Sequence, residues 1–237
     1  MRLNAFISNA GYCSRRKAAG LVRDGKVKVG GKVEASPWYV VREGDAVSVN
    51  GRLLHSEKKR LYFVVNKPRG VTTTVEDAHA LKKITDIVSE INTRVYPIGR
   101  LDKDSRGLII LTNDGDFCYR LTHPKFEIEK EYIATVKGSL DEPSLKRLKR
   151  GVFDEGEMLK VKSYSGVRES GGKTTLHLVI AEGKKRHLRR IFKVLGNPVI
   201  DLKRIRIGGL RLGDLKEGSF EKMDKDAICR LALKESK

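Results

Sequence analysis

The sequence predicts an α+β protein with two parts, a small domain over residues 1–60 and a larger domain over residues 61–237. Helical periodicity occurs twice near the start and is followed by short alternating segments, which is typical of a compact module. Further along, apolar runs of strand length alternate with amphipathic segments of helical length. A chain of 237 residues is long enough for a small domain followed by a larger one.

The first sixty residues contain two predicted helices. Apolar residues at Leu3, Ile7 and their neighbours follow helical spacing up to Gly11, a plausible stop. Ser14 can cap a second helix that ends near Gly25. Short strands are expected at residues 27–29 and 47–49, and a polar linker is expected at residues 51–60.

The composition favours a polyanionic partner. The formal net charge is +19 and the sequence pI is about 9.9. Residues 1–60 are the more densely basic part, with 13 Lys and Arg against 5 Asp and Glu. Such an excess favours nucleic acid before an anionic membrane. We find no stretch of membrane-spanning length and no signal-peptide pattern, and the three scattered cysteines suggest no disulfide framework, so a cytoplasmic protein is expected.

Three cations stand in the first turn of the second predicted helix, at Arg15, Arg16 and Lys17. Cations at this end oppose the helix dipole, and a bound phosphate would relieve that conflict. The alternative is that these flexible side chains simply reach water.

A continuous apolar run at residues 108–111 predicts a strand that is buried on both faces. A polar loop precedes it and carries Asp102, whose ionised form is favoured by the neighbouring Arg100, Lys103 and Arg106. A solvated turn with surface ion pairs is the alternative. Asp102, Asp104, Asp114 and Asp116 could suggest a metal nuclease or a calcium loop. In a calcium loop that starts at Asp102, however, Arg106 and Asn113 occupy two of the ligand positions, so no metal is expected.

Further elements follow from periodicity on both sides of this run. Strands are expected at residues 61–65, at 129–136, where Tyr132, Ala134 and Val136 share one face, and at 173–181. Helices are expected around residues 81–88, at 116–123 with Asp116 as its cap, and at 139–151.

A basic block begins at Lys184 and holds nine Lys and Arg against one acid up to Arg206. On a helix, Leu188, Ile191, Phe192 and Leu195 share one face, whereas Arg186, Arg190 and Lys193 group opposite them. Arg189 falls between the two groups and can lean inward. The alternatives for the basic stripe are a solvated helix face and a membrane-surface helix.

The stretch from Gly99 to Gly115 resembles the signature of the RsuA/RluB/RluE/RluF-type ribosomal RNA pseudouridine synthases. Residues 1–60 are similar to their S4-like RNA-binding domain, and the resemblance covers nearly the whole chain. It implies a catalytic domain over residues 61–237 with a mixed, mainly antiparallel central sheet flanked by helices. Two departures are His187, where the family usually has Gln, and Gly208-Gly209 in place of Gly-Pro.

The resemblance also implies roles for individual residues. It makes Asp102 the catalytic aspartate and Arg189 the arginine that pairs with Asp102. Tyr132 is implied to be an active-site residue that stacks on the target base and helps to move a proton. It places the Asn-Lys-Pro-x-Gly stretch at residues 66–70 in a structural element lining the site. The residues expected to contact RNA are Arg15, Arg16, Lys17, Lys67, Arg100, Arg186, Arg190 and Lys193.

The resemblance implies isomerisation of a uridine in ribosomal RNA. The sequence is most similar to the family members that act on large-subunit RNA. The base must first leave its stack, and an ionised carboxylate then acts as nucleophile or stabilises a glycal-type intermediate. No cofactor is expected. The partner is expected to be ribosomal RNA or a ribosome assembly intermediate and not a membrane, and the protein is expected to be a monomer. The alternatives are small-subunit (16S) RNA as substrate, or a non-catalytic RNA-binding or ribosome-assembly protein.

Overall fold

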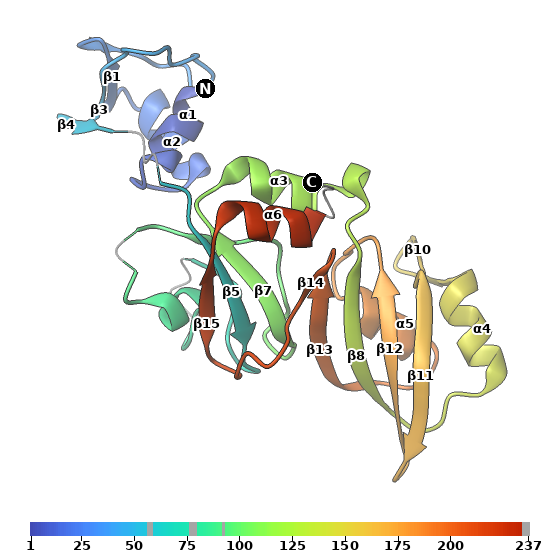
Figure 1. Cartoon of the computed structure of the whole chain (residues 1–237). Helices are drawn as coiled ribbons and strands as arrows, with labels where there is room; N and C mark the ends of the chain where they lie inside the picture. Colours follow the sequence, from blue (N-terminus) through green and yellow to red (C-terminus); the bar gives the residue numbers. More distant parts are fainter. Residues whose placement is uncertain (56–58, 76–79, 92, 234–237) are drawn as a thin grey trace. The chain divides into compact units, whose positions relative to one another are not determined.

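The structure is a computed structural model that describes residues 1–55, 59–75, 80–91 and 93–233 (Figure 1). Its contacts divide the chain into two compact units. One consists of Met1–Arg60 with short pieces at Asn92–Arg94 and Asn113–Gly115. The other contains the rest of the chain and holds the larger sheet.

The first unit packs two short helices against a small sheet. The helices are α1 (Leu3–Asn9) and α2 (Arg15–Arg23), and the Ser14 hydroxyl accepts a hydrogen bond from the Lys17 N–H at 3.3 Å, which confirms the predicted cap. The sheet has the order β2-β1-β3-β4. Its strands are β1 (Val27–Val29), β2 (Lys32–Val33), β3 (Val47–Val49) and β4 (Arg52–Leu54).

The predicted linker at residues 51–60 is therefore wrong in its first part. Arg52–Leu54 forms β4 because Asn50 and Gly51, both at positive φ, turn the chain back onto β3. Leu54 is buried in the core of this unit. Residues 56–58 of the expected linker lie outside the described residues.

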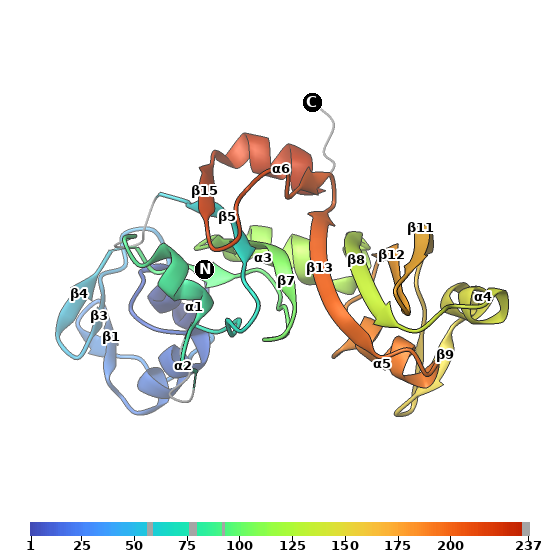
Figure 2. The ribbon, with the colours of Figure 1, turned by 90° about the horizontal axis from the view of Figure 1, so that it is seen from below.

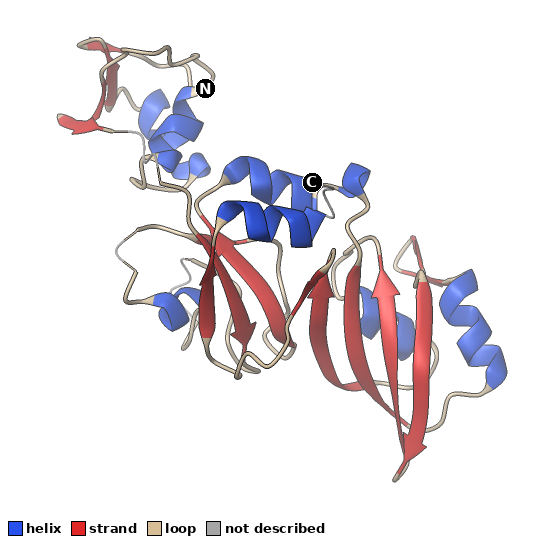
Figure 3. Cartoon of the chain, in the orientation of Figure 1, coloured by secondary structure: helices blue, strands red, loops and turns tan. Residues whose placement is uncertain are grey.

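The second unit is built on a mixed, mainly antiparallel sheet, as predicted (Figure 3). Nine strands belong to it in the described part of the chain, and its main path runs β11-β12-β8-β13-β7-β5-β15. Among these strands, only β13 and β7 pair in parallel. The strands on this path are β5 (Tyr62–Lys67), β7 (Arg106–Thr112), β8 (Lys130–Lys137), β11 (Ser163–Ser170), β12 (Lys173–Ile180), β13 (Val199–Ile207) and β15 (Phe220–Met223).

Smaller elements complete this unit. β6 (Tyr96–Pro97) pairs with β7, and β14 (Leu210–Arg211) pairs with β13. A separate hairpin joins β9 and β10, and helices and 3₁₀ turns connect the strands. Their bounds are β9 (Val152–Asp154), β10 (Glu157–Leu159), η1 (Ile84–Val88), η2 (Pro124–Phe126), α3 (Gly115–Thr122), α4 (Glu142–Arg150), α5 (His187–Val194) and α6 (Lys225–Leu233).

The central strand β7 is buried on both faces, which confirms the prediction for residues 108–111. Leu108 and Ile110 join a core with residues of α3 and α6, whereas Ile109 and Leu111 join the core on the opposite face. This division follows from the alternation of side chains along a strand. Figure 1 shows α3 and α6 side by side above β5 and β7.

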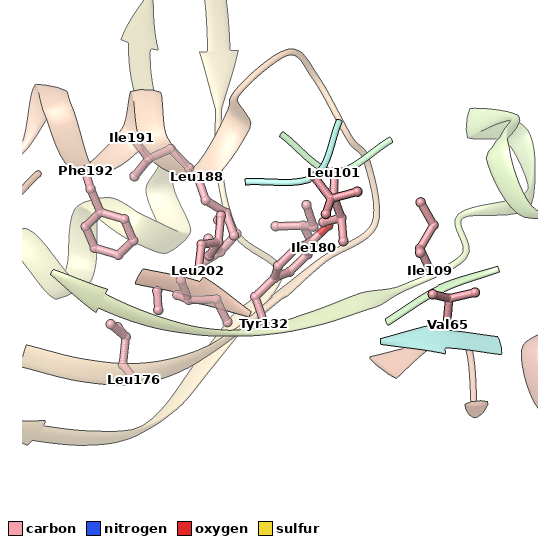
Figure 4. Close-up of a cluster of buried hydrophobic side chains, with 14 of the residues drawn as sticks. Val65, Leu101, Ile109, Tyr132, Leu176, Ile180, Leu188, Ile191, Phe192 and Leu202 are labelled. Atoms are coloured by element: carbon pink, nitrogen blue, oxygen red, sulfur yellow. The ribbon is translucent and has the colours of Figure 1, made fainter. Parts of the chain in front are cut away.

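Helix α5 covers one face of the β8–β12–β13 part of the sheet. Its Leu188, Ile191 and Phe192 are buried against strand residues that include Leu176 and Leu202 (Figure 4). The view in Figure 2 shows α5 next to β13 and β8. The predicted apolar face of this helix is thus confirmed.

The parallel junction between β7 and β13 is short and tight. It consists of two residue pairs, Lys203 with Arg106 and Arg204 with Gly107. Gly107 has a φ of +102°, and a Cβ there would overlap the backbone oxygen of Arg204 and lie 2.8 Å from its nitrogen. Glycine is required at this position because β13 approaches so closely. The loop that carries Asp102 ends at this junction.

Two predicted helices differ in their details. In place of a helix over residues 81–88, the chain forms the 3₁₀ turn η1, and Leu81 is 94 % exposed because it lies before the turn. Helix α3 begins at Gly115, so Asp116 lies in its first turn and does not cap it. A carboxylate there still interacts favourably with the helix dipole.

Candidate active site

The loop that carries Asp102 connects β6 to β7 and is held in place by the segment after β5. The Thr73 hydroxyl donates to the carbonyl oxygen of Leu101 at 2.7 Å. The Gly70 N–H donates to the carbonyl oxygen of Lys103, also at 2.7 Å. Asp102 lies between these two anchors, and its side chain is 34 % exposed. The loop therefore presents this carboxylate in a fixed position that a solute can reach.

Arg189 reaches this loop from α5. Its Nε lies 3.7 Å from Oδ2 of Asp102, and its Nη1 lies 3.2 Å from Oδ2 of Asp104. Nη2 donates to the carbonyl oxygen of Asp104 at 3.0 Å and to the Ser105 hydroxyl at 3.1 Å. The guanidinium thus stabilises the conformation of the loop through hydrogen bonds, and its charge offsets the negative charges of Asp102 and Asp104.

Asp104 is a site residue that sequence reasoning missed, since it was considered only as a possible metal ligand. It is the nearer of the two carboxylates to Arg189. Burial lowers the pKa of Arg189, and the charges of Asp104 and Asp102 oppose this shift. The position of Asp104, two residues after Asp102 in the same loop, was the available signal.

Tyr132 comes from β8 and is 7 % exposed. Its ring packs among apolar side chains that include Leu101, Ile180 and Leu202 (Figure 4). Its hydroxyl accepts a hydrogen bond from Nη1 of Arg204 at 3.5 Å. Arg204, which is 2 % exposed, was not predicted as a site residue.

Asp102, Tyr132 and Arg189 line the same cavity. It has a volume of about 90 Å³, and Leu101, Ile180 and Leu202 also border it. Asp102 and Tyr132 further border a larger cavity of about 620 Å³, together with Lys130 and Arg204. A nucleotide-sized ligand requires a pocket of a few hundred Å³, and the larger cavity meets this requirement.

A third cavity, of about 470 Å³, also borders Asp102. Its lining includes Arg69, Arg100 and Arg186. Arg100 and Arg186 belong to the predicted RNA contacts, and both side chains are exposed. Arg69 was not predicted.

The other predicted RNA contacts differ in their surroundings. Arg15, Arg16 and Lys17 are exposed in the first turn of α2, and Lys193 is exposed on α5.

The prediction that Lys67 contacts RNA is contradicted by its burial, since its exposed fraction is 0 %. Its Nζ donates to the carbonyl oxygen of Val71 at 2.7 Å and lies 3.5 Å from that of Lys103. Burial lowers its pKa to about 8, opposed by the charges of Asp104 and Asp102. Lys67 therefore ties the segment after β5 to the Asp102 loop.

The prediction for Arg190 is also wrong, because this side chain does not lie on the open face of α5. It is 9 % exposed, and it contacts Asp154 through Nε and Glu157 through Nη1, each at 2.6 Å. These hydrogen bonds raise its pKa. Helical periodicity could not show that the β9–β10 hairpin packs against this side of the helix.

His187 occupies the position of the expected Gln and is 4 % exposed. Its Nε2 lies 2.9 Å from the carbonyl oxygen of Lys160, and burial lowers its pKa. Arg106, expected near Asp102, binds Asp201 at 2.8 Å and Glu217 at 3.4 Å instead.

Within the described residues, no helix is long and apolar enough to cross a membrane. The same residues contain no group of three or more His, Cys, Asp or Glu arranged to hold a metal ion.

Comparison with known proteins is consistent with this arrangement. A sequence model of the RNA pseudouridylate synthase family matches residues 61–193, and a model of the S4 domain matches residues 1–47. The chain is 42 % identical to the ribosomal large subunit pseudouridine synthase B of Bacillus subtilis (strain 168), over 97 % of this chain and 95 % of that protein. It is 38 % identical to an uncharacterized RNA pseudouridine synthase of Aquifex aeolicus (strain VF5), over 98 % and 93 %.

A solved structure described as a pseudouridylate synthase has a similar fold. It superposes with a TM-score of 0.67 at 28 % sequence identity, and the match covers 98 % of this chain and 99 % of that one. The resemblance stated from the sequence and the predicted fold class are both confirmed. This chain therefore belongs to the RNA pseudouridylate synthase family.

Proposed function

We propose that this enzyme isomerises a uridine of large-subunit ribosomal RNA to pseudouridine, with Asp102 as the nucleophile. The observation that carries the proposal is the common cavity of Asp102, Tyr132 and Arg189. The choice of large-subunit RNA rests on the Bacillus subtilis relative, whose name specifies that subunit.

The geometry supports a division of roles within the site. The Asp102 carboxylate is partly exposed, and the positive charge of Arg189 at 3.7 Å favours its ionised form beside the cavity. The ring of Tyr132 offers an apolar surface for stacking by a base that has left the RNA helix. The reaction breaks the bond from C1′ to N1 and forms one from C1′ to C5. The proton lost from C5 is balanced by the one gained at N1.

The first unit is proposed to dock the RNA. Arg15, Arg16 and Lys17 are exposed at the start of α2, where backbone N–H groups also favour a phosphate. We place the boundary between the docking part and the catalytic part at residue 60, because the two contact units separate there. Deleting residues 1–60 should weaken RNA binding and flatten its dependence on salt, and an unchanged salt slope would count against this role.

The activity can be tested on protein-free ribosomal RNA. Large- and small-subunit transcripts are incubated with the purified enzyme, and pseudouridine is mapped by carbodiimide modification and primer extension. We expect a modified uridine in the large-subunit transcript. Modification confined to the small-subunit transcript would overturn the assignment of substrate. RNA binding without any modification would support the non-catalytic alternative.

The variant Asp102→Asn tests the nucleophile in the same assay. It removes the negative charge and keeps the size of the side chain, so turnover should disappear while the Kd for RNA stays within about threefold of the wild-type value. Asp214→Asn serves as the matched control, because it makes the same change at an exposed carboxylate of the same unit. Turnover by Asp102→Asn would refute the proposed role.

A further inference from the structure

Two cations with little exposure border the larger cavity, and no carboxylate neutralises them. Arg204 belongs to β13 and Lys130 to β8, and both line the cavity of about 620 Å³ with Asp102 and Tyr132. Among the described residues, no carboxylate oxygen lies within 4.0 Å of a charged nitrogen of either side chain. Buried charges are ordinarily paired, so this arrangement requires an explanation.

The acidic residues nearest to Lys130 in the sequence are engaged elsewhere. Glu129 binds Lys162 at 2.7 Å and Arg206 at 3.3 Å. Glu131 binds Arg206 at 2.8 Å and lies 3.1 Å from Nδ1 of His177. Neither carboxylate is therefore available as a counterion for the cavity.

The hydrogen bonds of the two cations are incomplete as well. Arg204 donates through Nε to the carbonyl oxygen of Leu108 at 2.6 Å and through Nη1 to the Tyr132 hydroxyl at 3.5 Å. Its Nη2 is buried and has no hydrogen-bond partner among the described residues. Lys130 donates to the carbonyl oxygen of Ile128 at 2.9 Å. An unpaired N–H on a buried cation is costly unless a ligand supplies the acceptor.

The like charges of these side chains also oppose each other. Burial and then the charge of Arg204 lower the pKa of Lys130 to about 8. Such repulsion is offset when an anion binds between the cations. A phosphate group suits this position because it is anionic and offers several acceptor oxygens.

We propose that Arg204 and Lys130, together with the Tyr132 hydroxyl, bind the phosphate on one side of the target nucleotide. This inference rests on the proposed function and refines it. The base then occupies the smaller cavity, where Leu101, Ile180 and Leu202 provide apolar walls. Asp102 borders both cavities, which fits a ribose held between base and phosphate.

The proposal can be tested by removing the positive charge from the protein and, separately, the negative charge from the phosphate of the RNA. After the uridine modified by the wild-type enzyme has been mapped, three short RNAs that contain this uridine are synthesised. One is unmodified, and the others carry a neutral methylphosphonate at the 5′ or the 3′ phosphate of the target. The value of kcat/KM is measured for the wild type, for Arg204→Gln and for Lys130→Gln.

Arg204→Gln should lower kcat/KM on the unmodified RNA by roughly 10- to 100-fold, the loss expected for a charge-assisted hydrogen bond. One of the two methylphosphonates should lower the wild-type value by a similar factor but change that of Arg204→Gln by less than about threefold. Lys203→Gln is the matched control, since it removes a charge from the neighbouring residue of β13, whose side chain points to the other face of the sheet. It should keep the full sensitivity of the wild type.

Additive losses at both phosphates would overturn the proposal, because the variant and the methylphosphonate would then act on different contacts. A loss in Arg204→Gln from misfolding is recognised by circular dichroism and thermal unfolding. Lys130→Gln provides a second route, since it leaves the bond from Arg204 to Leu108 intact.

Calorimetric binding of uridine, uridine 5′-monophosphate and uridine 3′-monophosphate tests the same site without turnover. One monophosphate should bind the wild type about tenfold more tightly than uridine, and Arg204→Gln should remove that difference. If this result occurs but no ribosomal RNA is modified, the proposed function fails and the phosphate site stands. If RNA is modified but neither monophosphate binds more tightly than uridine, the phosphate site is refuted and the function stands.

Discussion

Helix α5 carries two adjacent arginines in opposite electrostatic surroundings. Arg190 has three carboxylates within 4 Å, those of Asp154, Glu155 and Glu157. Arg189 approaches Asp104 and Asp102 less closely, at 3.2 and 3.7 Å, and its buried Nε has no hydrogen-bond partner within the described residues. One arginine is thus fully paired, and the other is incompletely paired beside a cavity.

We propose that this difference separates a structural ion pair, that of Arg190, from one that serves the site, that of Arg189. Around Arg190 the protein has optimised the contacts of a hairpin with a helix. Around Arg189 the nearby cations Arg186 and Arg69 add positive charge, and the two carboxylates do not fully neutralise it. We infer that the remaining positive charge is available to an anionic substrate. Substitutions at the two positions should therefore have different consequences.

Among the variants that test this difference, Arg189→Gln should have the largest effect on turnover. Loss of the guanidinium releases the Asp102 loop and should lower kcat/KM on a ribosomal RNA fragment by about 10²-fold or more. The melting temperature should change little, because Asp102 and Asp104 are each about a third exposed and can be solvated. Arg189→Lys, which keeps the charge but not the fork, should restore only part of the activity. Wild-type turnover in Arg189→Gln would remove the distinction between the two arginines.

Arg190→Gln should show the reverse pattern. It leaves Asp154 and Glu157 without their cation, so the melting temperature should fall by several degrees, as measured by calorimetry. Below the transition, kcat/KM should stay within about threefold of the wild-type value, since a surface away from the reacting atoms is altered. A large loss of turnover in a well-folded Arg190→Gln protein would show that both arginines serve the site.

A smaller effect is expected for Asp104→Asn. This carboxylate contacts Arg189 but, unlike Asp102, does not line the smaller cavity of about 90 Å³. We therefore expect kcat/KM to fall by only about tenfold. Combining Asp104→Asn with Arg189→Gln should add little to the loss from Arg189→Gln alone. Additive losses in this cycle would mean that Asp104 acts independently of Arg189.

The smallest effect is expected in the pH dependence of the free energy of unfolding, through Lys130, a cation that has no carboxylate partner in the part of the chain that the structure describes. The pKa of Lys130 is about 8 in the folded protein, against an ordinary value of 10.5. Between these two values the unfolded chain binds more protons, so the free energy of unfolding gains a contribution that rises with pH. Relative to Lys130→Met, the wild type should become more stable between pH 7.5 and 9.5 in urea titrations. Parallel pH profiles would mean that neither burial nor the charge of Arg204 lowers the pKa of Lys130 in the folded protein.

Periodicity predicted most elements because burial on one face leaves a regular trace in the sequence. It located β7, β8, β12 and both helices of the first unit. It failed where a neighbouring element decides the outcome. Residues 51–60 as a whole appeared polar enough for a linker, yet residues 52–54 pair with β3. Arg190 lies on the predicted polar side of α5, but the β9–β10 hairpin covers that side.

The site shows the same division. Asp102, Tyr132 and Arg189 were named from a resemblance in sequence, and their common cavity is a feature of the structure. Asp104 and Arg204 were not predicted as site residues, because their contacts with the site involve partners that lie far along the chain, in α5 and β8. Lys67 was misassigned because its positive charge suggested RNA, while its burial depends on how the Asp102 loop folds over it.

The sequence by itself determined the α+β class, the buried central strand and a strong preference for a polyanionic partner, since these depend on local pattern and total charge. Tertiary structure decided which cations are neutralised and which are left to meet a ligand. Charge and hydrophobicity are properties of single residues, whereas pairing depends on the distance between residues that only the folded chain brings together.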